Sequence, residues 1–193
     1  MNRIIIVCLV VCVYMVLGNY GNAAEDVKYH SVESIKYDLD NDGEQEIIER
    51  IFVGEDLESL PDSWVVRVTS KDKSYLSEPI IETPLFSGSS IEIINVSDKV
   101  TPIIALWYSA GAYARVVELY KYDDGLVLVN NIGCGGYVFS DEPMRFEDID
   151  SDGTLELIAL QRDWSNDSGI IPIEEIYNFR DGKYILSKES ERV

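Results

Sequence analysis

The chain has 193 residues, of which 46% are hydrophobic and 26% are charged, and its net charge is −19. The 35 acidic residues outnumber 16 basic ones, which excludes an extended nucleic-acid interface because phosphate contacts need basic patches. Only one histidine is present, so a zinc site or a Ser-His-Asp site has little support. The length suffices for one domain with its own hydrophobic core.

The first 24 residues are predicted to be a secretory signal peptide. Met1–Arg3 carries a positive charge, residues 4–17 form an apolar run, and Gly21–Ala24 supplies small residues for cleavage. The apolar run is too short for a comfortable membrane span, and no later segment approaches one. We therefore expect a secreted or periplasmic protein without a membrane span after cleavage, with an uncleaved anchor as the alternative. Residues 25–193 then form a single domain.

Cleavage of this segment would remove Cys8 and Cys12 and leave Cys134 as the one cysteine of the domain. An internal disulfide is then excluded, although a secretory compartment would permit one. Cys134 lies among glycines and is predicted to be a small buried residue, with a reactive thiol as the alternative. Bound metal would have to supply whatever cross-linking the domain needs.

Two nonapeptides, about 110 residues apart, share one acidic pattern. Residues 38–46 and 148–156 both read D-x-D-x-D-G-x-x-E. Calcium takes about six to eight oxygen ligands, and alternating aspartates in a tight loop direct carboxylates inward while the glycine permits the sharp turn. The residue after the glycine would offer its backbone carbonyl, and the final glutamate would close the shell. The predicted ligands of two calcium ions are Asp38, Asp40, Asp42, Glu44 and Glu46, and Asp148, Asp150, Asp152, Thr154 and Glu156.

These loops differ from EF-hands, which need an apolar residue two positions after the glycine and a carboxylate at position 12. Gln45 occupies the apolar position of the first loop, and Ala159 occupies the twelfth position of the second. Short apolar runs of strand length follow both loops. A calcium loop that leads directly into a strand resembles the FG-GAP and VCBS repeats of β-propeller proteins, including the calcium-bearing blades of integrin α heads. The resemblance implies propeller-type blades and structural ions.

The repeat extends to a third copy. Residues 94–106 lie between the two loops and look like a copy that has lost its metal ligands, because Pro102–Leu106 matches Glu156–Leu160. A hairpin pattern follows each copy, and two hairpins have Asp-Gly turns, at Asp124 and Asp181. We therefore predict an all-β antiparallel fold with three repeats of about 55 residues, each a loop, a strand, a variable loop and a hairpin.

Two arrangements of these repeats remain open. Three blades are too few for an ordinary closed propeller. The repeats could form a short propeller-like ring with extra strands from residues 25–37 and 80–95, or a compact β-sandwich.

The segment from Trp107 to Arg115 is the candidate partner-binding loop. It combines small residues with flanking aromatics, a composition common in binding surfaces; the alternative is that Trp107 and Tyr113 are core residues at strand ends. This segment also resembles, less closely than the acidic loops resemble FG-GAP repeats, the Ser-Gly-x-x-Tyr loop of bacterial periplasmic inhibitors of lysozyme. Ser109 and Tyr113 have the spacing of that loop, but Ala110 stands where the loop has its glycine. The predicted partner-binding residues are Trp107, Ser109 and Tyr113.

The sequence leaves two functional hypotheses. The first is a calcium-stabilised β-repeat module that binds a protein or a glycan, and the second is an inhibitor of a lysozyme-like enzyme. An acidic protein would be attracted to basic lysozymes, which favours the second. Catalytic calcium would need a substrate pocket with an open coordination position, and no motif marks one, so we expect no enzymatic activity.

Overall fold

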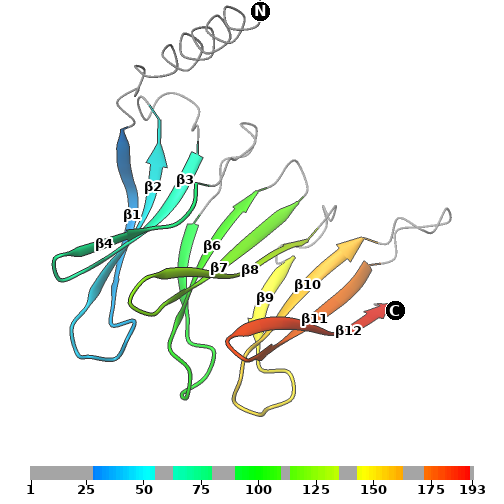
Figure 1. Cartoon of the computed structure of the whole chain (residues 1–193). Coiled ribbons are helices and arrows are strands. Elements are labelled where there is room, and N and C mark those ends of the chain that lie inside the picture. The colour runs from blue at the N-terminus through cyan, green and yellow to red at the C-terminus, as the bar shows by residue number, and fades with distance from the viewer. Residues whose placement is uncertain are drawn as a thin grey trace, which may run out of the picture.

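The computed structural model describes residues 28–54, 63–79, 90–109, 114–134, 143–162 and 172–191, and the predicted signal peptide lies outside these ranges. Within them the chain is all-β and forms three antiparallel sheets, each of four consecutive strands (Figure 1). The first sheet contains β1 (Tyr29–Tyr37), β2 (Glu46–Val53), β3 (Ser63–Ser70) and β4 (Lys73–Leu76). The second contains β5 (Ser90–Ile94), β6 (Ile103–Ser109), β7 (Arg115–Tyr122) and β8 (Leu126–Cys134). The third contains β9 (Met144–Glu147), β10 (Glu156–Arg162), β11 (Pro172–Arg180) and β12 (Lys183–Glu191). The predicted antiparallel all-β fold is confirmed.

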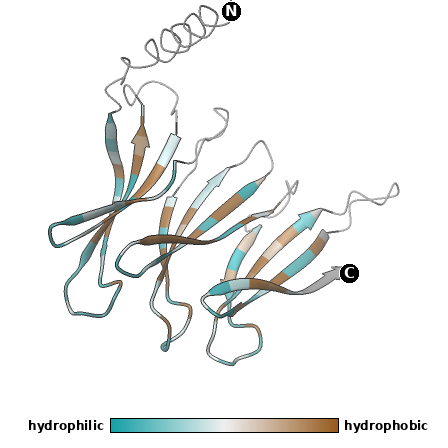
Figure 2. Cartoon of the chain, in the orientation of Figure 1, coloured by the Kyte–Doolittle hydropathy of each residue, from teal (hydrophilic) through white to brown (hydrophobic). Residues whose placement is uncertain are grey.

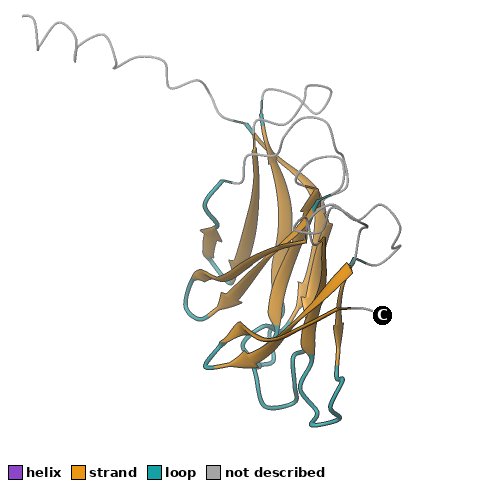
Figure 3. Ribbon diagram, turned by 90° about the vertical axis from the view of Figure 1, so that its right-hand side faces the viewer, coloured by secondary structure: helices purple, strands orange, loops and turns teal. Residues whose placement is uncertain are grey.

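The three sheets follow one another in chain order and lie side by side like successive blades (Figures 1 and 3). Each sheet is a simple meander in which every strand pairs with the next one in sequence. The sequence reading placed each acidic loop before the first strand of its repeat. In the structure one strand precedes each loop, so that loops 38–45, 95–102 and 148–155 connect the first two strands of their sheets.

The hairpins between the last two strands of each sheet turn through residues with positive φ. Asp181 and Gly182 have φ angles of 51° and 80°, as the tight turn of a two-residue hairpin requires. Asp124 has a φ of 49° in the turn between β7 and β8, and Lys71 has a φ of 52° in the turn between β3 and β4. Both predicted Asp-Gly hairpins therefore form.

The second sheet is buried on both faces. Ile103 and Ala105 of β6 belong to the core shared with the third sheet, whereas Ile104 and Leu106 belong to the core shared with the first. Because successive side chains of a strand point to opposite faces, a strand between two sheets needs a continuous apolar run. Figure 2 shows hydrophobic segments on the strands of all three sheets.

Polar contacts also connect adjacent sheets. The Tyr37 hydroxyl donates to Asn95 Oδ1 at 2.8 Å, which joins the first sheet to the middle loop. The Leu155 amide donates to the Val96 carbonyl at 2.8 Å, which joins the middle loop to the third sheet. Asn130 exchanges two hydrogen bonds with the backbone of Tyr184, at 3.0 and 2.7 Å. The loops are thus fixed against their neighbours as well as within their own sheets.

Candidate metal centres

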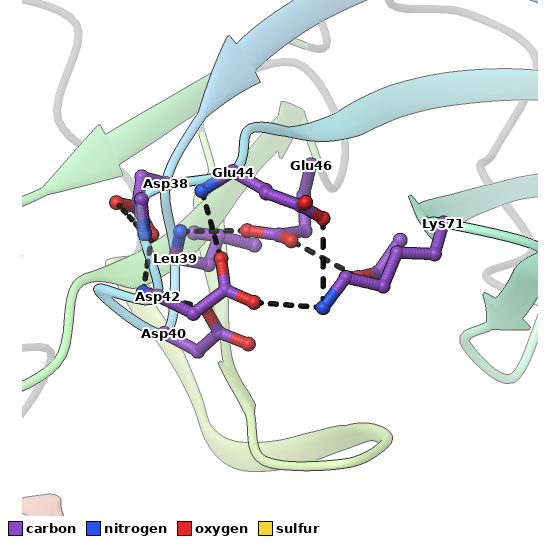
Figure 4. A network of polar contacts seen from close by, with 9 residues as sticks. Asp38, Leu39, Asp40, Asp42, Glu44, Glu46 and Lys71 are labelled. Carbon is purple, nitrogen blue, oxygen red and sulfur yellow. Dashed lines mark hydrogen bonds and ion pairs between the residues drawn. The ribbon is translucent and has the colours of Figure 1, made fainter.

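The first acidic loop is closed by its own backbone amides (Figure 4). Asp38 accepts hydrogen bonds from the Asp42 and Gly43 amides at 3.1 and 3.0 Å. Asp40 also accepts from the Asp42 amide at 3.1 Å. Asn41 and Gly43 have φ angles of 59° and 89°, so the loop needs residues that tolerate the left-handed region. One carboxylate oxygen from each of Asp38, Asp40 and Asp42 lies within 4.8 Å of the others, close enough to hold one metal ion.

The second acidic loop repeats this geometry almost bond for bond. Asp148 accepts from the Asp152 and Gly153 amides at 3.1 and 3.0 Å, and Asp150 accepts from the Asp152 amide at 3.2 Å. Ser151 and Gly153 have φ angles of 61° and 84°. The ligand group here consists of Asp148, Asp150 and Glu156, again within 4.8 Å of one another. The same nine-residue pattern therefore produces the same loop in two different sheets.

The glutamate that ends each loop is buried, with only 1% of Glu46 and of Glu156 exposed. Glu46 accepts from the Leu39 amide at 2.8 Å and from the Ser70 hydroxyl at 3.0 Å. Glu156 accepts from the Ile149 amide at 3.0 Å. Both carboxylates therefore brace the start of their loop, a role that sequence reasoning did not assign. Glu156 also belongs to a potential ligand group, whereas Glu46 does not.

The electrostatics of the second loop favour a cation. Burial raises the pKa of Glu156, and the nearby carboxylates of Asp150 and Asp152 raise it further. Each of these effects penalises the negative form of the carboxyl group. A divalent cation among these oxygens would relieve the repulsion between them.

Glu44 and Thr154 were predicted to offer their backbone carbonyls. In the structure their backbone amides donate to the aspartate two positions earlier, at 2.8 Å to Asp42 and 2.7 Å to Asp152. The Glu44 side chain points out of the loop and lies 3.5 Å from the Lys71 ammonium group. The Glu44 side chain is 65% exposed, so it belongs to the loop surface.

Lys71 is a residue of the first site that sequence reasoning missed. It lies in the turn between β3 and β4, and its Nζ is 2.9 Å from Asp42 Oδ2 (Figure 4). The hydrogen bond from Lys71 holds the pKa of Asp42 below its ordinary value, and the same contact raises the pKa of Lys71 to about 12. In the third sheet the corresponding turn begins with Asp181. The two loops therefore differ in the charge that accompanies them.

We expect Lys71→Gln to strengthen metal binding by the first loop. The ammonium group competes with a cation for Asp42, but the contact is solvent-exposed, so calcium affinity should rise by only about two- to fivefold. Titration in an Asp150→Asn background would report the first loop alone. Lys73→Gln removes the same charge from an exposed position on β4 and is the matched control; an equal gain in both variants would contradict the specific competition.

The second residue of each of the three loops is buried only where a following sheet packs against the loop. Leu39 is 0% exposed in the core between the first two sheets, and Val96 is 1% exposed in the core between the second and third. Ile149 occupies the same position in the last loop and is 45% exposed. The first two loops are each anchored by a following sheet of the chain, and among the described residues no fourth sheet covers Ile149.

The candidate partner-binding residues are only partly described. Trp107 is half-buried and lines a cleft of about 590 Å³ between the second and third sheets, with Arg115 at the same cleft. Its indole N–H donates to Glu92 at 3.1 Å, and its ring meets Phe146 edge-on at 5.9 Å. Ser109 ends β6 and is half-buried, and Tyr113 lies outside the described residues. Trp107 thus contacts both the core and a cleft.

Cys134 is a free, buried cysteine. Burial raises the pKa of its thiol, which lowers the thiolate fraction and makes the group less reactive. The prediction of a small buried residue is therefore confirmed.

Family models, curated proteins and solved structures were compared with the chain, and none of them matches it. Among the described residues, none belongs to a helix of the length and apolarity needed to cross a membrane. Fold and geometry therefore define the class: an all-β protein of three four-stranded meanders, with two acidic loops that could each hold a metal ion.

Proposed function

We propose that this chain is a secreted or periplasmic calcium-binding β-repeat module, related to the FG-GAP and VCBS type, that binds a protein or glycan partner. The observation that supports this most directly is the repetition of one hydrogen-bonded acidic loop in two sheets. Carboxylate oxygens alone, without thiolate or imidazole, are the ligands that suit a hard cation such as calcium. The proposal assigns the chain no catalytic step.

The calcium ions are assigned a structural role because of where the loops lie. Each acidic loop connects two neighbouring strands and is braced from beneath by a buried glutamate. An ion held there would fix the path of the chain between those strands, so that metal binding and folding are coupled. The cleft beside Trp107 is a candidate contact for the partner, since aromatic side chains often anchor interfaces.

Calcium titration by calorimetry tests the metal assignment. We expect two ions per chain, because the middle loop, residues 95–102, has neither of the first two aspartates of the pattern. Asp40→Asn and Asp150→Asn should each remove one ion. Asp98→Asn in the middle loop is the matched control and should leave two. A stoichiometry other than two, or loss of binding in the control, would contradict the assignment.

The alternative function is inhibition of a lysozyme-like enzyme. Its support is the net charge of −19, which would accelerate encounters with basic enzymes, together with the position of Ser109 at the end of β6. Binding assays separate the two functions: an inhibitor must bind a basic lysozyme and lower its activity, whereas a general module need do neither.

A further inference from the structure

A second cleft, of about 450 Å³, lies between the first and second sheets, and none of its described lining residues belongs to an acidic loop. Its lining comes from the end of β4 and the segment that follows, and from β7 and β8: Leu76, Ser77, Glu78, Pro79, Glu118, Tyr120, Leu126 and Leu128. Leu76 and Leu128 are 48% and 50% exposed, so the walls present apolar surface to solvent. Both charged side chains of the described lining are carboxylates. This combination suits a ligand with an apolar stem and a positive end.

Glu118, only 6% exposed, is the buried carboxylate of this cleft. Its Oε1 accepts from the side-chain Nδ2 of Asn131 at 2.8 Å and from the Tyr108 hydroxyl at 3.3 Å. Its Oε2 accepts from the Tyr120 hydroxyl. Burial, followed by the contact with Glu118, raises the pKa of Tyr120, which keeps this hydroxyl protonated as a donor. Three donors thus orient the carboxylate and leave one acceptor position, on Oε2.

The third sheet repeats this arrangement with Glu175. In both sheets the tyrosine two residues further along the strand, Tyr120 or Tyr177, donates to the glutamate. The register to the last strand shifts just before that tyrosine in both sheets, so Glu175 occupies in the third sheet the place that Glu118 occupies in the second. Gln161 Nε2 also donates to Glu175, at 3.0 Å.

Glu118 is the more deeply buried of these two carboxylates, because Glu118 is 6% exposed whereas Glu175 is half-buried. Among the described side chains, no lysine or arginine forms an ion pair with Glu118. A buried carboxylate is costly unless it is paired or fully hydrogen-bonded. Glu118 is thus held ready for a cation from outside the chain.

We propose that this cleft receives the side chain of a lysine presented by a partner protein. The ammonium group binds the open position on Glu118 Oε2, and the methylene groups contact Leu126 and Leu128. Lysine suits the site better than arginine, because a guanidinium group prefers two free carboxylate oxygens, and Oε1 already accepts two hydrogen bonds. The inference rests on the proposed partner-binding function and names the chemistry that the partner must offer.

The test is an NMR titration of the calcium-loaded full chain with Nα-acetyl-lysine methylamide. We expect saturable shifts at the cleft with a dissociation constant of about 1 mM, given the few atoms of one side chain. The Nε-acetylated form of the same probe is the neutral control, and the arginine analogue should bind more weakly. Glu118→Gln should weaken binding by about 10- to 100-fold, the cost of losing a charge-assisted contact.

Two further variants separate loss of the site from loss of the fold. Glu175→Gln removes the equivalent carboxylate of the third sheet and should leave lysine binding unchanged. Leu128→Ala shortens an exposed wall without disturbing the core and should weaken binding of the lysine probe. No binding by the native protein, or equal binding of the neutral probe, overturns the proposal. Preference for free spermidine over a lysine-containing peptide overturns the assignment to a protein partner. Calcium binding is measured separately, so failure here leaves the metal assignment standing.

Discussion

Removal of calcium should lower the free energy of unfolding by about 5 kcal/mol. At a free concentration near 100 times the dissociation constant, each independent site stabilises the folded chain by about 2.7 kcal/mol. For a domain of this size, that loss corresponds to a fall in melting temperature of about 10–20 °C. The physical reason is that each empty loop gathers carboxylates within 4.8 Å of one another, and their repulsion then acts without a cation to balance it.

Thermal unfolding in calcium and in excess chelator measures this effect. The double variant Asp40→Asn, Asp150→Asn is the control, because its melting temperature should not depend on chelator. In chelator the same variant should be as stable as the native chain or slightly more so, since it carries fewer crowded charges. A native protein that melts at the same temperature in both buffers would show that the loops are ordinary acidic turns.

Leu39→Ala should destabilise the fold by about 2–5 kcal/mol, whereas Ile149→Ala should change stability by less than about 0.5 kcal/mol. Both residues follow the first aspartate of an acidic loop. Leu39 is fully buried between two sheets, so its truncation leaves a cavity, but Ile149 is 45% exposed and its truncation leaves none. Urea denaturation of both variants in saturating calcium provides the comparison.

Comparing Leu39→Ala with Ile149→Ala isolates the effect of packing between the sheets, because the two residues have the same place in the same motif. A change in the denaturation midpoint with an unchanged slope would report stability alone. Equal destabilisation of the two variants would mean that the last loop is also covered, and that the third sheet does not end the stack. The pair therefore tests the described order of the sheets as well as the loops.

The pattern of Asp, Gly and Glu in residues 38–46 and 148–156 predicted two similar loops, and the structure forms them. That prediction succeeded because the loop is local: its turn depends on Gly43 and Gly153, and the hydrogen bonds within it join residues no more than seven positions apart. The strands and Asp-Gly hairpins were predictable for the same reason, since alternation and turn chemistry are properties of short segments.

The contacts that distinguish the two loops were not predictable, because they join distant parts of the chain. Lys71 reaches Asp42 across 29 positions, and no local pattern indicates that a hairpin turn will meet a loop. Glu46 likewise accepts a hydrogen bond from Ser70, 24 positions away. Sequence reasoning therefore treated the ten predicted ligands as two equal sets.

The sequence by itself determined the local elements of this protein: an all-β chain in three repeats and two acidic loops suited to a hard cation. Only the tertiary structure decided which loop has a buried second residue, which carboxylate is paired and where the clefts lie. Leu39 and Ile149 have the same place in the same motif, yet one lies in a core and the other faces solvent. The physical reason is that burial depends on the neighbouring sheet, and the position of that sheet follows from packing between segments far apart in the chain.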